Sequence, residues 1–245
     1  MVRSAVAAVA FLVAATLAHG AAVPAPASQA ISAADTDLPT TDRMAYCPPG
    51  KAWRAPYGTA VKIPAAAVAG DQTWTGAWTK AYSAAKNMPT LIFNANNWSK
   101  GTIGAGTGVI SYYVRVPADG RYRWSADMAA PHTTDYNDFW TKFPGGVFKQ
   151  RFGGLIAAGN GWLKVYSNRG ANAFVWGGGT VDHNPHMLVT PWLWKGQTVE
   201  FRISGRSNKV KIAHFGLHKC QTTGRGSPSC ANLNEMKSAP IAQCV

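Results

Sequence analysis

The 245-residue chain has few charged residues and very few acidic ones. Charged side chains make up 14% of the sequence, and only 11 residues are Asp or Glu, against 24 Lys and Arg. Most glycoside hydrolases need two carboxylates that face each other across a sugar. Asp135 and Asp138 lie too close along the chain to form an obvious opposed pair, and Asp127 alternates outward on a predicted strand. The shortage of acids therefore argues against glycosidase chemistry.

Other signatures of enzymes and metal sites are missing as well. No two cysteines have the close C-x-x-C spacing that is typical of zinc sites, and no G-x-S-x-G marks a serine nucleophile. In "DHNPH" (182–186), Pro185 prevents a helix from bringing His183 and His186 onto one face. We interpret this stretch as a turn that carries two surface histidines.

Long hydrophobic runs are absent after the first residues. Ala5 to Leu17 form an apolar run that is too short to span a membrane, with Arg3 before it and the small-residue stretch Ala18-His19-Gly20 after it. We therefore predict a secretory signal over residues 1–20, no transmembrane segment, and a protein that is secreted to the extracellular space or cell surface. Residues 21–43 are rich in Ala, Pro, Ser and Thr without an apolar period, which predicts a flexible lead-in.

Cysteines are few, but their number is even. In an exported protein, four cysteines predict two disulfides, with three possible connectivities. One of these would close a short Gly/Ser/Pro turn between Cys220 and Cys230 and leave Cys47 and Cys244 to tie the ends of the chain together. We predict one domain over residues 44–219 and a disulfide-stapled tail over 220–245.

Aromatic residues and period-two patterns are abundant. "VISYYVRV" (109–116) and "RYRWSADM" (121–128) alternate apolar and polar residues around the turn "PADG", which predicts a β-hairpin with one buried face. "QTVEFRIS" (197–204) repeats the pattern, with Val199, Phe201 and Ile203 inward.

"KVKIAHFGL" (209–217) shifts its phase after Ile212, which predicts a β-bulge. Ala-rich pieces at 64–69 and 80–87 predict short helices that end at Gly70 and Pro89. Many short strands separated by Gly and Pro turns indicate an all-β fold, an antiparallel β-sandwich with short peripheral helices.

Three stretches resemble a known family when they are taken in order. They are "HTTDYNDFWTKFP" (132–144), "GWLKVYSNRGANAFVWGGGTVD" (161–182) and "VEFRISGRSNKVKIAHFGLH" (199–218). With their N-D-x-W, K-x-Y-x-N-x-G and S-G-R-S pieces they are similar to secreted galactose-binding-like jelly rolls akin to family six carbohydrate-binding modules, over roughly 90–218. The resemblance implies a jelly roll that binds glycans through loops at one rim.

The family's usual structural calcium site looks degraded in this sequence. Ala213 stands where related modules carry an Asp in the last strand, and residues 44–70 contain no acid. We therefore expect no cofactor. Because calcium prefers several oxygen ligands, a replacement loop of Asp135, Asn137 and Asp138 remains an alternative.

A sugar site needs an exposed aromatic ring for stacking and short polar groups for paired hydrogen bonds. The predicted ligand-binding residues come from "DYND", "VWGGG" and "GRSN": Asp135, Tyr136, Asn137, Asp138, Trp176, Arg206 and Asn208. Trp140 and Trp162 are predicted to be core residues. An alternative for Arg206 is that it braces Asp138 structurally.

The net charge of +13 favours an acidic or sulfated polysaccharide as the partner, since the basic residues are scattered rather than blocked as in nucleic-acid binders. A basic surface without specificity is the alternative to this ligand class. We predict a secreted, non-catalytic, lectin-like module that binds extracellular or cell-wall polysaccharide or a glycoconjugate, and no nucleic acid. One alternative is a self-assembling structural subunit of an extracellular coat or appendage. Another is a polysaccharide lyase, although the Y-x-K-x-G-x-Y-x-Q strand of jelly-roll lyases is missing. "NWS" makes Asn97 a glycosylation acceptor in a eukaryotic source.

Overall fold

A computed structural model describes residues 47–48, 50–68, 78–94, 105–144, 149–150, 157–158, 161–167, 171–180, 187–222, 228–230 and 232–245. The described residues all belong to one compact unit, which is delimited as Pro39–Val245. The predicted signal, the predicted lead-in, Asn97 and the "DHNPH" histidines lie outside the described residues. In the described part of the chain, no helix has the length and hydropathy needed to cross a bilayer.

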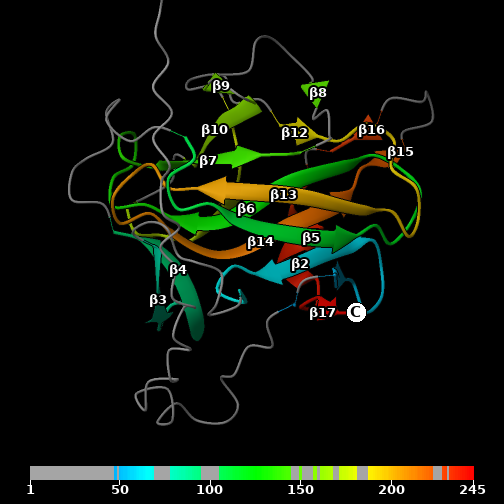
Figure 1. Cartoon of the computed structure of the whole chain (residues 1–245), viewed down its shortest axis with the longest axis horizontal. Coiled ribbons are helices and arrows are strands. Elements are labelled where there is room, and N and C mark those ends of the chain that lie inside the picture. Colours follow the sequence, from blue (N-terminus) through cyan, green and yellow to red (C-terminus); the bar gives the residue numbers. More distant parts are fainter. Residues whose placement is uncertain are drawn as a thin grey trace, which may run out of the picture. The chain divides into compact units, whose positions relative to one another are not determined.

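The described strands form two large sheets (Figure 1). The seven-stranded sheet has the order β17 (Gln243–Cys244), β1 (Trp53–Arg54), β5 (Ile110–Arg115), β13 (Thr198–Ser204), β7 (Asp138–Lys142), β10 (Trp162–Tyr166) and β9 (Ala157–Ala158). The eight-stranded sheet has the order β3 (Trp78–Ser83), β4 (Met88–Phe93), β14 (Lys211–Lys219), β6 (Tyr122–Ala129), β12 (Leu188–Val189) and β8 (Lys149–Gln150), with β2 (Ala60–Pro64) beside β14 and β11 (Val175–Gly177) beside β6. The described strands pair antiparallel except for β1 with β5. β15 (Gln221–Thr222) and β16 (Pro228–Ser229) form a separate pair, and α1 (Asn234–Ser238) is a short helix in the tail.

Aromatic side chains from both sheets meet in the core. Trp124 of β6 lies with its ring centroid 5.9 Å from that of Phe201 on β13 and 6.2 Å from that of Phe139 on β7. Tyr112 of β5 stacks on Phe201 at 4.9 Å and contacts Phe215 of β14 at the same distance. The two sheets therefore pack face to face through their apolar sides, and the predicted all-β sandwich is confirmed.

The predicted hairpin of residues 109–128 is wrong, although the alternation was interpreted correctly. β5 pairs with β13 in one sheet, whereas β6 pairs with β14 in the other. The turn around Gly120 thus carries the chain across the core from one sheet to the other. Period-two alternation fixes which face of a strand is buried, but it does not fix the neighbouring strand.

The predicted Ala-rich helices are also wrong where they are described. Residues 78–83 form β3, which pairs with β4, and residues 84–87 form a turn. Pro64 ends β2, and a turn follows at 65–66. Burial of Trp78 against Phe93, with ring centroids 5.0 Å apart, outweighs the helix propensity of alanine in the 80–87 piece.

Two other predictions are confirmed. The register of β14 against β6 shifts between Ile212 and His214, and this bulge turns Phe215 and Leu217 into the core. The disulfides are Cys47–Cys244 and Cys220–Cys230. The first joins the ends of the described chain where β17 pairs with β1.

Candidate functional site

The predicted site residues, apart from Trp176, lie at one end of the sandwich, on two loops and, for Asp138, at the first position of β7. Residues 130–137 join β6 to β7, and residues 205–210 join β13 to β14. Both loops leave the sheets on the left-hand side of Figure 1, where β13 ends and β7 begins. A backbone hydrogen bond from the Ser207 N–H to the Asp138 carbonyl, 3.1 Å long, joins the two loops. We call Asp135, Tyr136, Asn137, Asp138, Arg206, Ser207 and Asn208 the polar rim.

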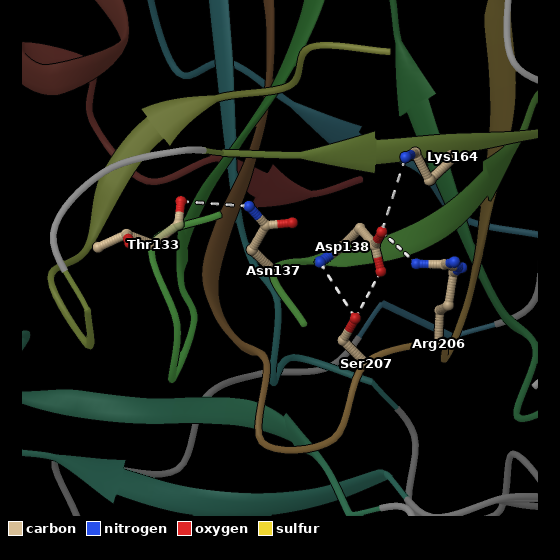
Figure 2. Close-up of polar contacts among 6 residues, drawn as sticks. All are labelled: Thr133, Asn137, Asp138, Lys164, Arg206 and Ser207. Atoms are coloured by element: carbon tan, nitrogen blue, oxygen red, sulfur yellow. Dashed lines mark hydrogen bonds and ion pairs between the residues drawn. The ribbon is translucent and has the colours of Figure 1, made fainter. Parts of the chain in front are cut away.

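Asp138 is the buried centre of the polar rim. Its carboxylate forms an ion pair with Arg206 and accepts a hydrogen bond from the Ser207 hydroxyl, and Lys164 Nζ lies 4.0 Å from Oδ2 (Figure 2). The Asp138 N–H donates to Ser207 Oγ at 3.3 Å. Burying a carboxylate is costly unless other groups pair with it, and these contacts supply that pairing. The bracing role that the sequence offered as the alternative for Arg206 is therefore present in the structure.

Rings and cations alternate on the outer face of β7 and β10. The Arg206 guanidinium lies 5.3 Å from the Trp140 ring centroid, and Lys142 Nζ lies 6.0 Å from that of Trp162. Both tryptophans are buried as predicted, but they lie outside the cluster between the sheets. The inward positions next to them belong to Phe139 and Leu163.

The 130–137 loop holds Asp135 and Tyr136 outward in a fixed turn. His132 Nδ1 accepts a hydrogen bond from the Asp135 N–H at 3.0 Å, and the rings of His132 and Tyr136 lie edge to face at 6.3 Å. The Asn137 amide donates to the Thr133 carbonyl at 3.4 Å (Figure 2). Tyr136 has a φ of 51°, an uncommon backbone conformation that the surrounding contacts must maintain. Asp135 is exposed and Tyr136 half-buried, whereas Asn137 is buried.

The environment of Asp138 also bears on the calcium alternative. Two cationic side chains, Arg206 and Lys164, lie beside the carboxylate that would have to bind the ion. A calcium ion at this point would be a third cation and would meet electrostatic repulsion from the other two. Within the described residues, no group of three or more His, Cys, Asp or Glu side chains is close enough to hold a metal. The expectation of no cofactor, with the calcium loop as its alternative, stays a prediction.

Asn208 and Trp176 are placed differently from the rest. Asn208 is half-buried in the 205–210 loop, beside the brace. Trp176 lies on β11, and its ring stacks on His214 of β14, with centroids 6.1 Å apart and planes at 19°. It therefore covers the outer face of the eight-stranded sheet, away from the Asp138 brace on the other sheet. Its contact with a sugar stays a prediction.

Trp176 lies beside a buried ionic cluster that the sequence did not indicate. Asp127 is only 2% exposed, and its carboxylate lies 2.7 Å from Lys86 Nζ and 3.2 Å from His214 Nδ1. Burial alone would raise the pKa of Asp127, but hydrogen bonds from His214 and Lys86 and the charge of Lys86 outweigh it and lower that pKa. Burial lowers the pKa of His214, although its hydrogen bond with Asp127 opposes the change. Near neutral pH the carboxylate is therefore charged and the imidazole neutral.

Sequence reasoning also missed two exposed tryptophans at the opposite end of the sandwich. Trp192 and Trp194 follow β12, and they are 54% and 64% exposed. The signal for them was present in "PWLWKG" (191–196), where Leu193 is the inward residue and its two neighbours must point outward.

A cavity of about 340 Å³ lies beside the Cys47–Cys244 disulfide. Lys51, Trp53 and Tyr113 are among its lining residues. None of the predicted ligand-binding residues lines it. The candidate site is thus a surface of the rim rather than this cavity.

Neither a protein-family model nor a curated protein matches the chain. Among solved structures, the chain is similar to the C-terminal CBM6 of LamC, a marine laminarinase from Zobellia galactanivorans, at 15% identity over 65% of this chain and 99% of that one, with a TM-score of 0.37. It is similar to CBM6cm-2 from Cellvibrio mixtus lichenase 5A in complex with cellotriose, at 13% identity over 66% and 98%, with a TM-score of 0.39. It is also similar to a Paenibacillus xanthan lyase, at 19% identity over 66% of this chain and 13% of that one, with a TM-score of 0.38. The first two are carbohydrate-binding modules, the kind of module that the sequence motifs resemble.

Proposed function

We propose that the chain is a secreted, non-catalytic carbohydrate-binding protein whose polar rim holds a polysaccharide. Asp135 and Tyr136 contact the sugar, while Asp138, Arg206 and Ser207 hold the loop that presents them. The two disulfides support export, because such bonds form and persist in oxidising compartments.

The observation that carries this proposal is the fixed presentation of an aromatic ring beside a carboxylate. Tyr136 keeps part of its ring accessible, and the exposed Asp135 carboxylate next to it accepts hydrogen bonds. The ring suits the apolar face of a sugar, and the carboxylate suits its hydroxyl groups. Because the buried Asp138 network fixes the base of the loop, little conformational freedom is lost when a ligand binds.

The pairing of three carboxylates with cations supports a binding role without catalysis. A general acid at neutral pH needs a raised pKa, whereas the contacts of Asp127 lower its pKa. Asp138 is held by Arg206, and Glu200 accepts a hydrogen bond from Arg202 at 2.6 Å. These three carboxylates thus serve as partners of cations.

The preferred ligand is a polysaccharide that carries carboxylate or sulfate groups. The net charge of +13 raises the local concentration of polyanions around the protein. At the rim itself, exposed Lys209 follows Asn208 in the 205–210 loop, and its ammonium donates to Asn94 Oδ1 at 2.6 Å. A cation is therefore held in the 205–210 loop, the second loop of this end of the sandwich.

Affinity electrophoresis through gels that contain neutral, uronate or sulfated polysaccharides tests the proposal. We expect one glycan class to retard the protein at high salt, and Tyr136→Ala to weaken that interaction roughly tenfold, equivalent to about 1.4 kcal/mol. Tyr57→Ala is the matched control, since Tyr57 is a 72% exposed tyrosine outside the rim. Equal retardation of the wild type and Tyr136→Ala by every acidic polymer, abolished by salt, would reduce the interaction to a basic surface.

A further inference from the structure

Trp192 and Trp194 form an exposed aromatic pair at the end of the sandwich opposite the polar rim. Their ring centroids are 6.2 Å apart and their planes meet at 67°. The segment 190–197 that carries them runs between β12 and β13, beside the 116–121 connection from β5 to β6, on the right-hand side of Figure 1. Two neighbouring tryptophans that each expose more than half of their surface are typical of a contact surface.

The backbone under this pair is tightly held. Gly120 and Leu193 exchange two hydrogen bonds of 2.8 and 2.9 Å, and Leu193 is buried in the core. The Gly196 N–H donates to the Val116 carbonyl at 2.8 Å, and the Lys195 N–H donates to the Asp119 carboxylate at 2.6 Å. The two indole rings are therefore displayed from a fixed frame rather than from a loose loop.

Charged side chains flank the two rings. Since Gly120 and Leu193 are direct partners, strand alternation places their neighbours Asp119, Arg121, Trp192 and Trp194 on the opposite, outward side. Arg121 and Lys195 are exposed, whereas Asp119 caps the Lys195 N–H. We call Asp119, Arg121, Trp192, Trp194 and Lys195 the tryptophan rim.

Positive groups outnumber negative ones in the tryptophan rim, where Arg121 and Lys195 are cationic and Asp119 is anionic. A Cβ on Gly120 would lie 2.8 Å from Lys219 Cε, so the Lys219 stem packs against this glycine, on the side of the Gly120–Leu193 pair away from the two rings.

We propose that the tryptophan rim is a second carbohydrate site, for a polysaccharide that carries carboxylate or sulfate groups. Two rings at 67° present two apolar facets, each suited to one sugar face of a chain that twists between residues. Arg121 and Lys195 would bind the anionic groups beside those faces. If the polar rim binds sugar as proposed above, one molecule has a site at each end and is bivalent. It then binds two stretches of polysaccharide and cross-links chains, an inference that rests on the proposed function.

Polar groups around the rings favour a sugar over a membrane as the partner. Asp119 and Gln197 lie within the same loops, and Asp119 is exposed and engaged by the backbone next to Trp194. Insertion into hydrocarbon would strip water from these polar groups, which is strongly unfavourable. A hydrated polysaccharide leaves them in water or hydrogen-bonds with them.

The test compares Trp192→Ala/Trp194→Ala with Tyr136→Ala, and with Tyr57→Ala as control. Thermal melting verifies that each variant is folded, and Arg121→Glu/Lys195→Glu gives a second probe that leaves the rings in place. Each protein is run through alginate, dextran sulfate and neutral glucan gels. Each is also mixed with the soluble polyanions to record turbidity from cross-linking, and sedimented with phosphatidylserine vesicles.

We expect both tryptophan-rim variants to lose turbidity with polyanions and to bind them at least fivefold more weakly, while the control does neither. Wild-type retardation and turbidity in these variants would overturn the second site, even if Tyr136→Ala confirms the first. If the tryptophan-rim variants lose binding and Tyr136→Ala does not, the site at the tryptophan rim is supported. The proposed sugar contact at the polar rim, and with it the bivalency, would then be refuted. Binding of vesicles but of no polysaccharide would overturn the sugar assignment in favour of a membrane.

Discussion

Replacement of Asp138 by alanine is expected to destabilise the protein strongly rather than to delete a sugar contact. The carboxylate is buried, it pairs with Arg206 and the Ser207 hydroxyl, and Lys164 Nζ lies 4.0 Å away. Alanine leaves two largely buried cations without their counter-charge. Removing one partner of a buried ion pair typically costs about 3–5 kcal/mol.

Arg206→Ala should cost less, about 1–3 kcal/mol, because Asp138 then keeps Ser207 and Lys164 as partners. A kilocalorie shifts the melting temperature of a domain of this size by roughly 2–4 °C. Thermal and urea denaturation should therefore show Asp138→Ala melting roughly 6–20 °C below the wild type, with Arg206→Ala in between. In the double variant, the loss should be smaller than the sum of the single losses by about 0.5–3 kcal/mol.

Sugar binding, measured where each variant is folded, separates bracing from contact. A folded Asp138→Ala protein with wild-type stability and no affinity for polysaccharide would refute the reasoning. Asp138 would then be a group that binds the ligand directly.

Three further predictions concern stability. Burial and the nearby Arg123 lower the pKa of His218 to about 4, below the unfolded value of 6.5. The neutral His218 therefore favours the folded state at pH 7, and the free energy of unfolding should fall by about 2 kcal/mol between pH 7 and pH 5. In urea unfolding, the His218→Gln variant should show a weaker dependence of the free energy of unfolding on pH. An unchanged dependence would contradict the assignment to His218. A Cβ on Gly205 would lie 1.8 Å from the Phe93 ring, so Gly205→Ala should lower the free energy of unfolding in urea by about 3 kcal/mol. Adding Phe93→Leu should restore part of that loss. A Gly205→Ala variant with wild-type stability would contradict this packing. Cys47→Ser/Cys244→Ser opens a loop with a sequence separation of 197 and should lower the free energy of unfolding by about 5 kcal/mol. Removing the short Cys220–Cys230 disulfide should lower it by only about 3 kcal/mol. Equal losses in urea unfolding would contradict the loop-entropy estimate.

Local patterns predicted local features well. The alternation in 197–204 placed Phe201 and Ile203 in the core, and the phase shift after Ile212 located the bulge. Such predictions succeed because the side-chain period of a strand is imposed by its backbone geometry. The disulfide pairing that would close the Cys220–Cys230 turn is also present.

Long-range relations could not be predicted in the same way. The alternating strands of 109–128 belong to different sheets instead of pairing, because alternation contains no information about the neighbouring strand. The sequence grouped Trp176 with the loop acids, but β11 pairs with β6 and places the indole over His214. Asp138 shows a related limit, since the sequence offered Arg206 as its brace but only the fold reveals that Lys164 lies beside it as well.

An amide-resolved NMR titration of the ¹⁵N-labelled protein with a soluble oligosaccharide tests the central claim most directly. The oligosaccharide is taken from whichever polysaccharide class retards the protein. Our account predicts saturable shifts of amides in residues 132–138 and 205–209, abolished by Tyr136→Ala and kept in Tyr57→Ala. Amides that do not move at these loops while the oligosaccharide binds elsewhere, or no saturable shift anywhere, would contradict it.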